Sequence, residues 1–402
     1  MSVHLPVYLD YNATTPVDPR ALEAMMPFFS EDFGNPSSRS HQLGWKAEAA
    51  VEAAREQVAA LIGADAREIV WTSCATESNN LAIKGACEMY RDKGRHIVTS
   101  KVEHRAVLDV CLAMERAGWR VTYLPVDETG RLTPQQVADA ITDETVLISI
   151  MAANNETGTL FPLAEIGRIA KAGGVLLHTD ATQAAGKIPL DVEALGVDLL
   201  SLSAHKLYGP KGSGCLYIRR RGPRVRLVRQ IDGGGHERGL RAGTLNVPGI
   251  VALGAAAEIA RAELPEEMAR LTALRDRLDK GIRGRLSDVR LNGHAEERLC
   301  NTLNLSFAYV EGEALMMKLG SIAASTGSAC RSESREPSHV LKAMNLSDEL
   351  AGAAIRLSLG RFTTEEEVDF AADAVSSAVR ELRAISPLYE LAKGQVEAKR
   401  IE

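Results

Sequence analysis

Several features that would mark a special class of protein are missing from these 402 residues. No apolar run approaches the roughly 20 residues that a membrane-spanning helix needs. The most apolar stretch, residues 250–257, ends at Glu258. The N-terminal residues also lack a basic segment followed by an apolar one, so we expect no secretory signal. These observations predict a protein of the cytoplasm without a membrane partner.

An excess of charge of one sign is absent as well. Lys and Arg number 47 and Asp and Glu number 53, which gives a net charge of −6. A mildly acidic chain has no overall attraction for phosphate backbones, so no nucleic-acid partner is expected. The hydrophobic fraction of 45% and the charged fraction of 25% are ordinary for globular proteins, which excludes a disordered or fibrous chain.

Cysteine is sparse and scattered. No two cysteines form a Cys-x-x-Cys pair, and the full set is Cys74, Cys87, Cys111, Cys215, Cys300 and Cys330. This spacing argues against a zinc cage and against a disulfide framework. We therefore expect free thiols in a reducing compartment and no metal site.

Between about residues 65 and 220, short β-rich runs alternate with helical patterns. Strands are expected at residues 68–72, 96–100, 120–125, 145–151, 175–179, 199–203 and 214–218. Helical patterns lie at residues 45–61, 81–90, 106–115 and 163–172. Apolar strands separated by helices are typical of a parallel sheet covered on both faces.

The pattern changes near residue 230. A long helical pattern follows at residues 250–286, with Pro265 as a candidate break. A second group then has expected strands at residues 301–307, 322–325 and 354–359 and helices at residues 313–319 and 364–385. We expect an α/β chain with a large, mostly parallel-sheet domain at residues 16–254. Residues 1–15 and 255–402 would form a smaller α+β domain.

Polar residues follow the expected strands at the sheet edge where open parallel sheets bind ligands. Asp180 and Lys206 are 206 − 180 = 26 residues apart, which allows one crossover between neighbouring strands. Pyridoxal phosphate requires this pair, because the lysine forms a Schiff base and the carboxylate keeps the pyridine nitrogen protonated. Alone, the aspartate is as well explained as a helix N-cap and the lysine as a solvated surface group. Together they favour the cofactor.

Other polar groups at the strand ends suit the rest of such a cofactor. Ala75 and Thr76 begin a helix, whose free N–H groups and dipole favour an anion. Ser203 and His205 add side-chain donors beside the lysine. His104 is suited to stack on a flat ring and to move protons near neutral pH.

Two further residues are candidates for contact with a substrate. Cys330 lies in a polar, small-residue segment where Arg331 and Arg335 favour the reactive thiolate; the alternative is an incidental surface thiol. Arg356 lies on the polar face of an alternating strand pattern. There it would either bind a substrate carboxylate or face solvent.

Motifs along nearly the whole chain resemble the cysteine desulfurases of the NifS/IscS type. These are class V aminotransferase-like enzymes of the fold-type I pyridoxal-phosphate group. The motifs lie at residues 8–16, 33–38, 75–78, 154–158, 178–183, 203–206, 233–239, 241–244, 327–330 and 356–367. The resemblance implies conversion of L-cysteine to L-alanine with a persulfide on Cys330. It also implies sulfur supply for iron–sulfur cluster assembly and other acceptors, a homodimer, and a NifU/IscU-like scaffold protein as acceptor.

The resemblance also implies roles for individual residues. The catalytic residues would be Cys330, Lys206 and His104. The pyridoxal 5'-phosphate would contact Ala75, Thr76, His104, Asn155, Asp180, Gln183, Ser203, His205, Lys206 and, from the other subunit, Thr244. In this set Gln183 would meet the ring hydroxyl. The substrate carboxylate would meet Asn12, Asn155 and Arg356, and Cys330 is also a candidate transient ligand of an iron–sulfur cluster.

Other functions stay open at this point. One is a pyridoxal-phosphate aminotransferase or a selenocysteine lyase of the same fold; an aminotransferase would be indifferent to Cys330. Another, from a different class, is a non-catalytic iron–sulfur scaffold that uses Cys330 and other thiols as ligands and binds no pyridoxal phosphate. The scattered cysteine spacing argues against the scaffold.

Overall fold

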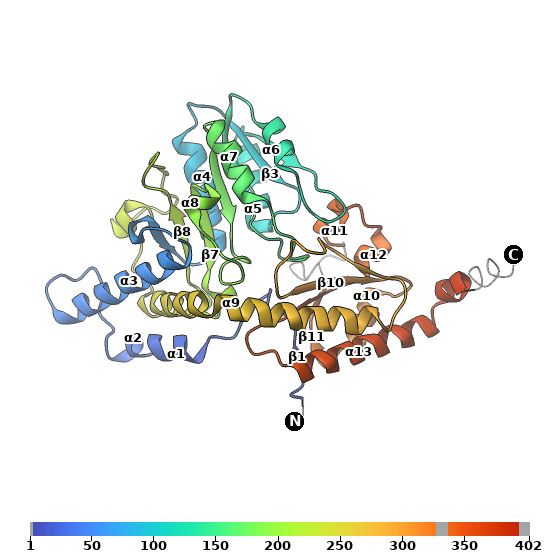
Figure 1. Cartoon of the computed structure of the whole chain (residues 1–402). Helices are drawn as coiled ribbons and strands as arrows, with labels where there is room; N and C mark the ends of the chain where they lie inside the picture. The colour runs from blue at the N-terminus through green and yellow to red at the C-terminus, as the bar shows by residue number, and fades with distance from the viewer. Residues whose placement is uncertain (1–2, 327–336, 394–402) are drawn as a thin grey trace.

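The computed structural model describes residues 3–326 and 337–393 (Figure 1). Within these ranges, seven strands form the larger sheet, and six of them run parallel. In spatial order they are β2 (Ile69–Thr72), β8 (Gly214–Ile218), β7 (Leu199–Ser203), β6 (Leu176–Asp180), β5 (Thr145–Ser149), β3 (His96–Ser100) and β4 (Arg120–Leu124). Each lies within about two residues of its expected position.

One strand of this sheet, β8, does not run parallel to the others. This strand runs antiparallel to both of its neighbours, β2 and β7. The reason is the connection from β7, residues 204–213, which is shorter than the dozen or more residues that a parallel crossover needs. The sheet is therefore mostly parallel, as the fold class requires.

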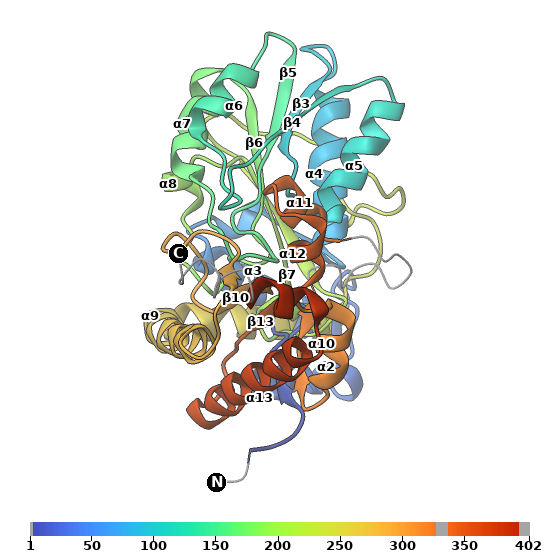
Figure 2. The same cartoon turned by 90° about the vertical axis from the view of Figure 1, so that its right-hand side faces the viewer.

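Helices cover both faces of this sheet, as Figure 2 shows. Successive residues of a strand point to opposite faces. Trp71 therefore packs in the cluster that contains α3 (Gln42–Leu61) and α7 (Leu163–Ala172), and its neighbour Val70 packs in the cluster that contains α4 (Ala75–Met89) and α5 (Arg105–Arg116). The expected helices are thus present. Other helices of the large part are α1 (Pro19–Met25), α2 (Pro27–Ser30), α6 (Pro134–Ala140) and α8 (Val192–Leu195), with short 3-10 turns η1 (Ala66–Glu68), η2 (Ala204–Lys206) and η3 (His236–Gly239).

A single long helix, α9 (Val247–Arg283), joins the two parts of the molecule. The candidate break at Pro265 does not occur. Pro265 and Arg261 are exposed, so the carbonyl that loses its N–H partner to the proline can be hydrated. The first half of α9 packs in the core of the large sheet, and its second half packs in a separate core through Leu271 and Leu278.

The smaller sheet is antiparallel within the described ranges. Its order is β12 (Ser325–Thr326), β13 (Ala354–Ser358), β10 (Thr302–Phe307) and β9 (Val289–Leu291). Its neighbouring helices are α10 (Gly312–Lys318), α11 (His339–Ala343), α12 (Asp348–Gly352) and α13 (Glu365–Ala384). The expected strand at residues 322–325 is divided: β11 (Ile322–Ala323) pairs with β1 (Val7–Tyr8), and β12 pairs with β13.

The N-terminal segment, residues 7–15, connects the two sheets. It pairs through β1 with β11, and Asp10 bridges to Ser358. Further along, the Thr15 amide donates to the His205 carbonyl at 2.9 Å, directly after β7. The division into residues 16–254 and residues 1–15 with 255–402 stays a prediction, because this segment contacts both parts.

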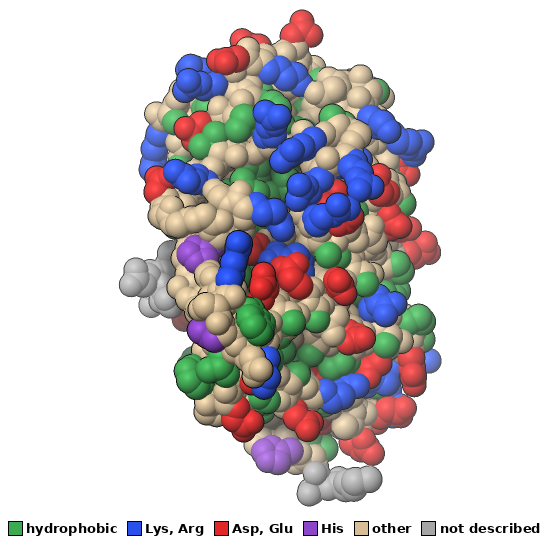
Figure 3. Space-filling view, turned by 90° about the vertical axis from the view of Figure 1, so that its left-hand side faces the viewer, with side chains coloured by type: hydrophobic (Ala, Val, Ile, Leu, Met, Phe, Trp, Pro, Cys, Tyr) green, Lys and Arg blue, Asp and Glu red, His purple; other side chains and the backbone are tan. Residues whose placement is uncertain are grey.

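Apolar side chains reach the surface on the side that carries the first helices. Figure 3 views this side and shows hydrophobic groups exposed on it. The exposed set includes Leu22, Met26, Phe29, Phe33 and Trp45. Neighbouring exposed apolar side chains of this size mark surfaces that bind other proteins. Among the described helices, none is long and apolar enough to cross a membrane.

Asp18 and Arg361 form a second connection between the parts of the chain. The Arg361 guanidinium donates to Asp18 at 2.6 Å and to Glu267 of α9 at 2.9 Å, and it lies 4.3 Å from the centre of the Tyr208 ring. Asp18 is also the N-cap of α1. Hydrogen bonds from Arg20, and then from Arg361, hold the pKa of Asp18 well below its usual range.

We expect Asp18→Ala to lower the free energy of unfolding at pH 7 by about 3 kcal/mol, because it leaves a buried guanidinium without one of its partners. Asp18→Asn keeps the N-cap acceptor and should cost about 1 kcal/mol less. Because the pKa is depressed in the folded state, the contribution of the carboxylate is present above about pH 4 and disappears as the pH falls further. Urea unfolding at pH 7 and pH 3 measures both effects; an equal deficit of Asp18→Asn at both pH values would contradict them.

Candidate active site

A cavity of about 390 Å³ lies where the carboxyl ends of β6 and β7 meet the N-terminus of α4. The strand ends supply Asp180, Gln183, Ser203, His205 and Lys206. Helix α4 supplies Ala75 and Thr76, and the start of α5 supplies His104. The segments beside the smaller sheet supply Asn12, Asn155 and Arg356. Thr244 is exposed and is not part of this lining, and Cys330 lies outside the described residues.

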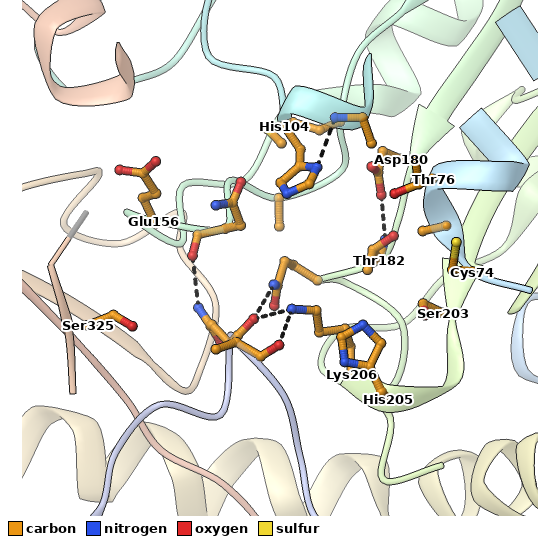
Figure 4. A pocket seen from close by; sticks show the side chains of 18 of the residues that line it. Cys74, Thr76, His104, Glu156, Asp180, Thr182, Ser203, His205, Lys206 and Ser325 are labelled. Atoms are coloured by element: carbon orange, nitrogen blue, oxygen red, sulfur yellow. Dashed lines mark hydrogen bonds between the residues drawn. The ribbon is translucent and has the colours of Figure 1, made fainter. Parts of the chain in front are cut away.

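Lys206 reaches the pocket from the turn η2, directly after β7. Its ammonium donates to the carbonyl oxygens of Asn12, at 2.5 Å, and Ala13, at 2.7 Å. Gln183 donates its amide to the same Asn12 carbonyl at 2.9 Å. Figure 4 shows the lysine side chain on the floor of the pocket, between this N-terminal segment and His205. The lysine end is therefore held by backbone oxygens from the far end of the chain.

Asp180 ends β6 and is nearly buried. Its carboxylate accepts hydrogen bonds from the Asn79 amide at 2.8 Å and from the Thr182 backbone N–H at 3.0 Å. Both groups that contact this carboxylate are therefore hydrogen-bond donors. Asn79 was not among the site residues predicted from the sequence. It lies three residues after Thr76 on the same face of α4, and that spacing could have revealed it.

His104 is the N-cap of α5, and its Nδ1 accepts the Ala106 N–H at 3.1 Å. Burial lowers its pKa, and the charge of Lys206 adds to this while Asp180 opposes it. The ring is therefore neutral at pH 7, with its donor on Nε2. Burial also lowers the pKa of His205 to about 4, so it offers the pocket a neutral imidazole.

The pocket has hydrogen-bonding groups that suit a bound phosphate and ring. Ser203 Oγ and Thr182 Oγ1 are buried without a partner among the described residues, although both residues line the cavity. Cys74, the N-cap of α4, gives no side-chain hydrogen bond to the first turn, so the turn's N–H groups are not capped from within. Figure 4 shows Cys74, Thr76, Ser203 and His205 on one side of the cavity. This set fits an anion.

A glycine lets the strand approach this turn closely. A Cβ on Gly214 of β8 would lie 3.0 Å from the backbone of Cys74 and 2.8 Å from the Leu202 carbonyl. Any side chain there would push the start of α4 away from the strand ends. The residues present, with Asp180 and His104 above, therefore fit pyridoxal 5'-phosphate.

Arg356 of β13 lies at the opposite end of the pocket. Its guanidinium donates to Asp10 at 2.6 Å and to the Asn155 carbonyl at 3.0 Å, while its buried Nε has no partner among the described residues. Asn12 donates to the same Asn155 carbonyl at 3.2 Å. The Nε–H of Arg356 is therefore a buried donor that could bind the carboxylate of a ligand in the pocket. Asp10 was missed by the sequence analysis, although it lies two residues before Asn12 in one of the motifs.

Glu156 contributes a buried carboxyl group to the same end of the pocket. Ser338 Oγ, at the N-terminus of α11, donates to it. Burial raises the pKa of Glu156 to about 7, although Ser338 and the charge of Arg356 act in the opposite direction. No group of three or more His, Cys, Asp or Glu side chains that could hold a metal ion occurs in the described part of the chain.

Comparisons with known proteins identify one protein family to which this chain is similar. The family profile described as Aminotransferase class-V matches residues 7–370. A protein named cysteine desulfurase IscS from Anaeromyxobacter sp. (strain K) is 60% identical over 398 residues, which cover 99% of this chain and 98% of that protein. One of the same name from Klebsiella pneumoniae subsp. pneumoniae is 55% identical over 400 residues, again 99% and 98% of the two chains.

Solved structures give the same result. One titled NifS-like protein superposes with a TM-score of 0.86 at 42% identity, covering 93% of this chain and 99% of that one. Another, titled SspA in complex with cysteine, has a TM-score of 0.79 at 40% identity, covering 89% and 100%. The α/β fold with its mostly parallel sheet is therefore shared along almost the whole chain.

The buried Glu156 carboxyl predicts a pH dependence of stability. Its pKa is raised in the folded state, so folding loses stability between the ordinary carboxyl value, near 4.5, and about 7. We expect Glu156→Gln, which keeps an oxygen for Ser338, to gain about 3 kcal/mol of unfolding free energy relative to wild type on going from pH 5 to pH 8. Denaturant unfolding at both pH values measures the difference, and an unchanged difference would contradict the buried, raised pKa.

Proposed function

The chain belongs to the aminotransferase class-V family, and from that premise we propose that it is a cysteine desulfurase. It is a pyridoxal 5'-phosphate enzyme that converts L-cysteine to L-alanine and supplies the sulfur for iron–sulfur cluster assembly and other acceptors. The observation that carries the proposal is the convergence of Lys206 and Asp180 in one pocket, in a chain 60% identical to a protein of that name.

Pyridoxal 5'-phosphate, when bound, withdraws electrons from the Cα of an amino-acid substrate. In the proposal Ser203, His205, Thr76 and the first turn of α4 hold its phosphate, and Asp180 faces its pyridine nitrogen. The neutral ring of His104 stacks on it. Thr244 adds a phosphate contact from the other subunit; its exposure and its absence from its own chain's pocket are compatible with that.

The substrate carboxylate is held at the Arg356 end of the pocket, with Asn155 and Asn12. Because Arg356 already pairs with Asp10, the substrate either shares the guanidinium or takes over part of that contact. Lys206 Nζ removes the Cα proton of the substrate. In this role the carbonyls of Asn12 and Ala13 aim the amine.

Cys330 is the proposed acceptor of the sulfur. Its thiolate attacks the substrate sulfur, so that an S–S bond forms and the Cβ–S bond breaks. The electron pair of the broken bond stays on Cβ, which takes up a proton equivalent to the one lost by the Cys330 thiol and becomes the methyl group of alanine. Cys330 is left as a persulfide. No oxidant is needed, because the substrate carbon is reduced as the sulfur is oxidised. Cys330 follows the pocket residue Ser325 by 330 − 325 = 5 residues, which an extended chain spans in roughly 17 Å.

The partners follow from the same proposal. The exposed apolar side chains on the first helices support a homodimer, in which each subunit would complete the other's site. A NifU/IscU-like scaffold protein receives the persulfide sulfur, and Cys330 can serve as a transient ligand while the cluster forms. The free thiols fit the cytoplasm.

The alternatives make different demands on Cys330. An aminotransferase of the same fold needs no thiol, and a metal-binding scaffold would bind no pyridoxal phosphate. The named relatives, and the structural neighbour described as a complex with cysteine, favour the desulfurase. A selenocysteine lyase shares the chemistry and differs in its preferred substrate.

We expect Cys330→Ala to retain the yellow colour of bound cofactor and to lose at least about 100-fold in sulfide release from L-cysteine, because the sulfur has no acceptor. Cys87→Ala is the matched control, since it removes a thiol that is buried in the core beside α5 and outside the pocket lining, and it should keep the activity. Absorbance spectra, sulfide release and the mass of the protein after cysteine treatment are the measurements.

Each result separates the hypotheses. Full turnover in Cys330→Ala with a keto-acid acceptor would identify an aminotransferase. A colourless wild-type protein that takes up no pyridoxal phosphate would refute the proposal as a whole.

A further inference from the structure

Lys187 is a buried lysine for which the proposed reaction has no use. It lies seven residues after Asp180, in the turn that leaves β6, and only 6% of it is exposed. Its ammonium donates to two oxygens of one residue, the backbone carbonyl of Gln183 at 3.3 Å and the side-chain Oε1 of Gln183 at 3.2 Å. Burying an ammonium is costly, so its contact with a pocket residue calls for an explanation.

An ammonium can only donate hydrogen bonds, whereas the glutamine amide has one accepting and one donating end. The atom of Gln183 that faces Lys187 must therefore be the oxygen. Its Nε2 then faces the other way and donates to the Asn12 carbonyl at 2.9 Å. An amide nitrogen carries two protons, so one N–H remains for a ligand in the pocket that Gln183 lines.

We propose that Lys187 is a positioning residue that fixes the orientation of the Gln183 amide, so that the pocket offers a hydrogen-bond donor, and never an acceptor, to a ring oxygen of its cofactor. The inference rests on the proposed function for the identity of that cofactor, pyridoxal 5'-phosphate. A fixed donor favours the ionised form of a ring hydroxyl, because a turned amide would present its oxygen to the negative charge instead.

The surroundings keep Lys187 in place and charged at neutral pH. Burial lowers the pKa of Lys187 to about 8, and the charge of Arg356 also lowers it. The Cys300 thiol and the carboxylate of Glu267, which lies on α9, raise it. His205 is the other titratable group that responds to its charge. The Cys300 thiol, just before β10, lies 3.7 Å from the Lys187 carbonyl. The lysine is thus enclosed by segments from both parts of the molecule.

The orientation also links two active-site groups. The Asn12 carbonyl accepts from both Gln183 Nε2 and Lys206 Nζ. If the Gln183 amide were turned, two oxygens would face each other at Asn12. Lys187 therefore also protects the hydrogen bond that aims Lys206.

The test is the pH titration of the visible absorbance of the bound cofactor in the full-length protein. We expect Lys187→Met to raise the titration midpoint by about one pH unit, the effect of one hydrogen bond to an ionised oxygen, and to weaken the binding of pyridoxal 5'-phosphate about tenfold. Lys187→Gln, whose amide can either donate or accept, should give a smaller shift in the same direction. Lys187→Arg, which still only donates, should titrate like wild type.

A double-mutant cycle with Gln183→Leu identifies the route of the effect. In the Gln183→Leu background, Lys187→Met should cause no further shift, because no amide remains to be oriented. Equal shifts in both backgrounds would mean that Lys187 acts only through its charge, and an unshifted Lys187→Met would mean that it does not act on the cofactor. Either result overturns the inference.

Failure of folding and failure of the proposed function are both distinguishable from these outcomes. Replacing the buried ammonium by an apolar group of similar shape removes its desolvation cost but leaves two oxygens of Gln183 without their donor. Thermal unfolding of the variant without cofactor measures the net effect on folding. If the wild-type protein takes up no pyridoxal 5'-phosphate, the proposed function fails. If all variants bind it with the same titration midpoint, only the role of Lys187 fails.

Discussion

Two backbone carbonyls near the N-terminus, those of Asn12 and Ala13, set the geometry on which the site depends. They hold the Lys206 ammonium, and the first of them also accepts the Gln183 amide. A backbone oxygen can be aimed this way only if the chain around it is fixed. Pairing of β1 with β11, the bridge from Asp10 to Ser358 and the hydrogen bond from Thr15 to His205 provide that fixation. The segment that pairs with β11 and the smaller sheet therefore helps to fix the position of Lys206, which follows a strand of the larger sheet.

The sequence contained the local part of this arrangement. Residues such as Asp180 and Lys206 directly follow or end strands, and parallel strands bring their carboxyl ends to one edge, so their meeting could be predicted from strand pattern alone. The direction of β8 within the mostly parallel sheet could not be predicted, because the pattern of apolar residues reports burial and not strand direction. The candidate break at Pro265 did not occur, since the exposed side of a helix tolerates an unpaired carbonyl. Asp10, Asn79 and Glu156 were missed because their positions in the site depend on pairing between distant segments or on helix spacing.

Two buried carboxyl groups lie in or next to the wall of the cavity. Glu103 and Glu156 are fully buried carboxyls whose pKa values burial raises to about 8 and about 7, so a proton on each is retained near neutrality. Asp180, by contrast, accepts hydrogen bonds from the Asn79 amide and from the Thr182 backbone N–H. In the proposed function Asp180 would face the pyridine nitrogen of the cofactor, and the two buried carboxyls, when protonated, would add no charge of their own beside it.

The contact of residues 7–15 with the smaller sheet determines when the site can form during synthesis on the ribosome. Asp10 and Asn12 form hydrogen bonds with Arg356 and Ser358. These contacts of the N-terminal segment can therefore form only after residues near the end of the chain have been synthesised. At 5–20 residues per second, that interval is roughly 20–70 s. From the synthesis of Lys206 until that of residues 356–358, the carbonyls of Asn12 and Ala13 lack the contacts that fix them. The site can therefore form only near the end of translation.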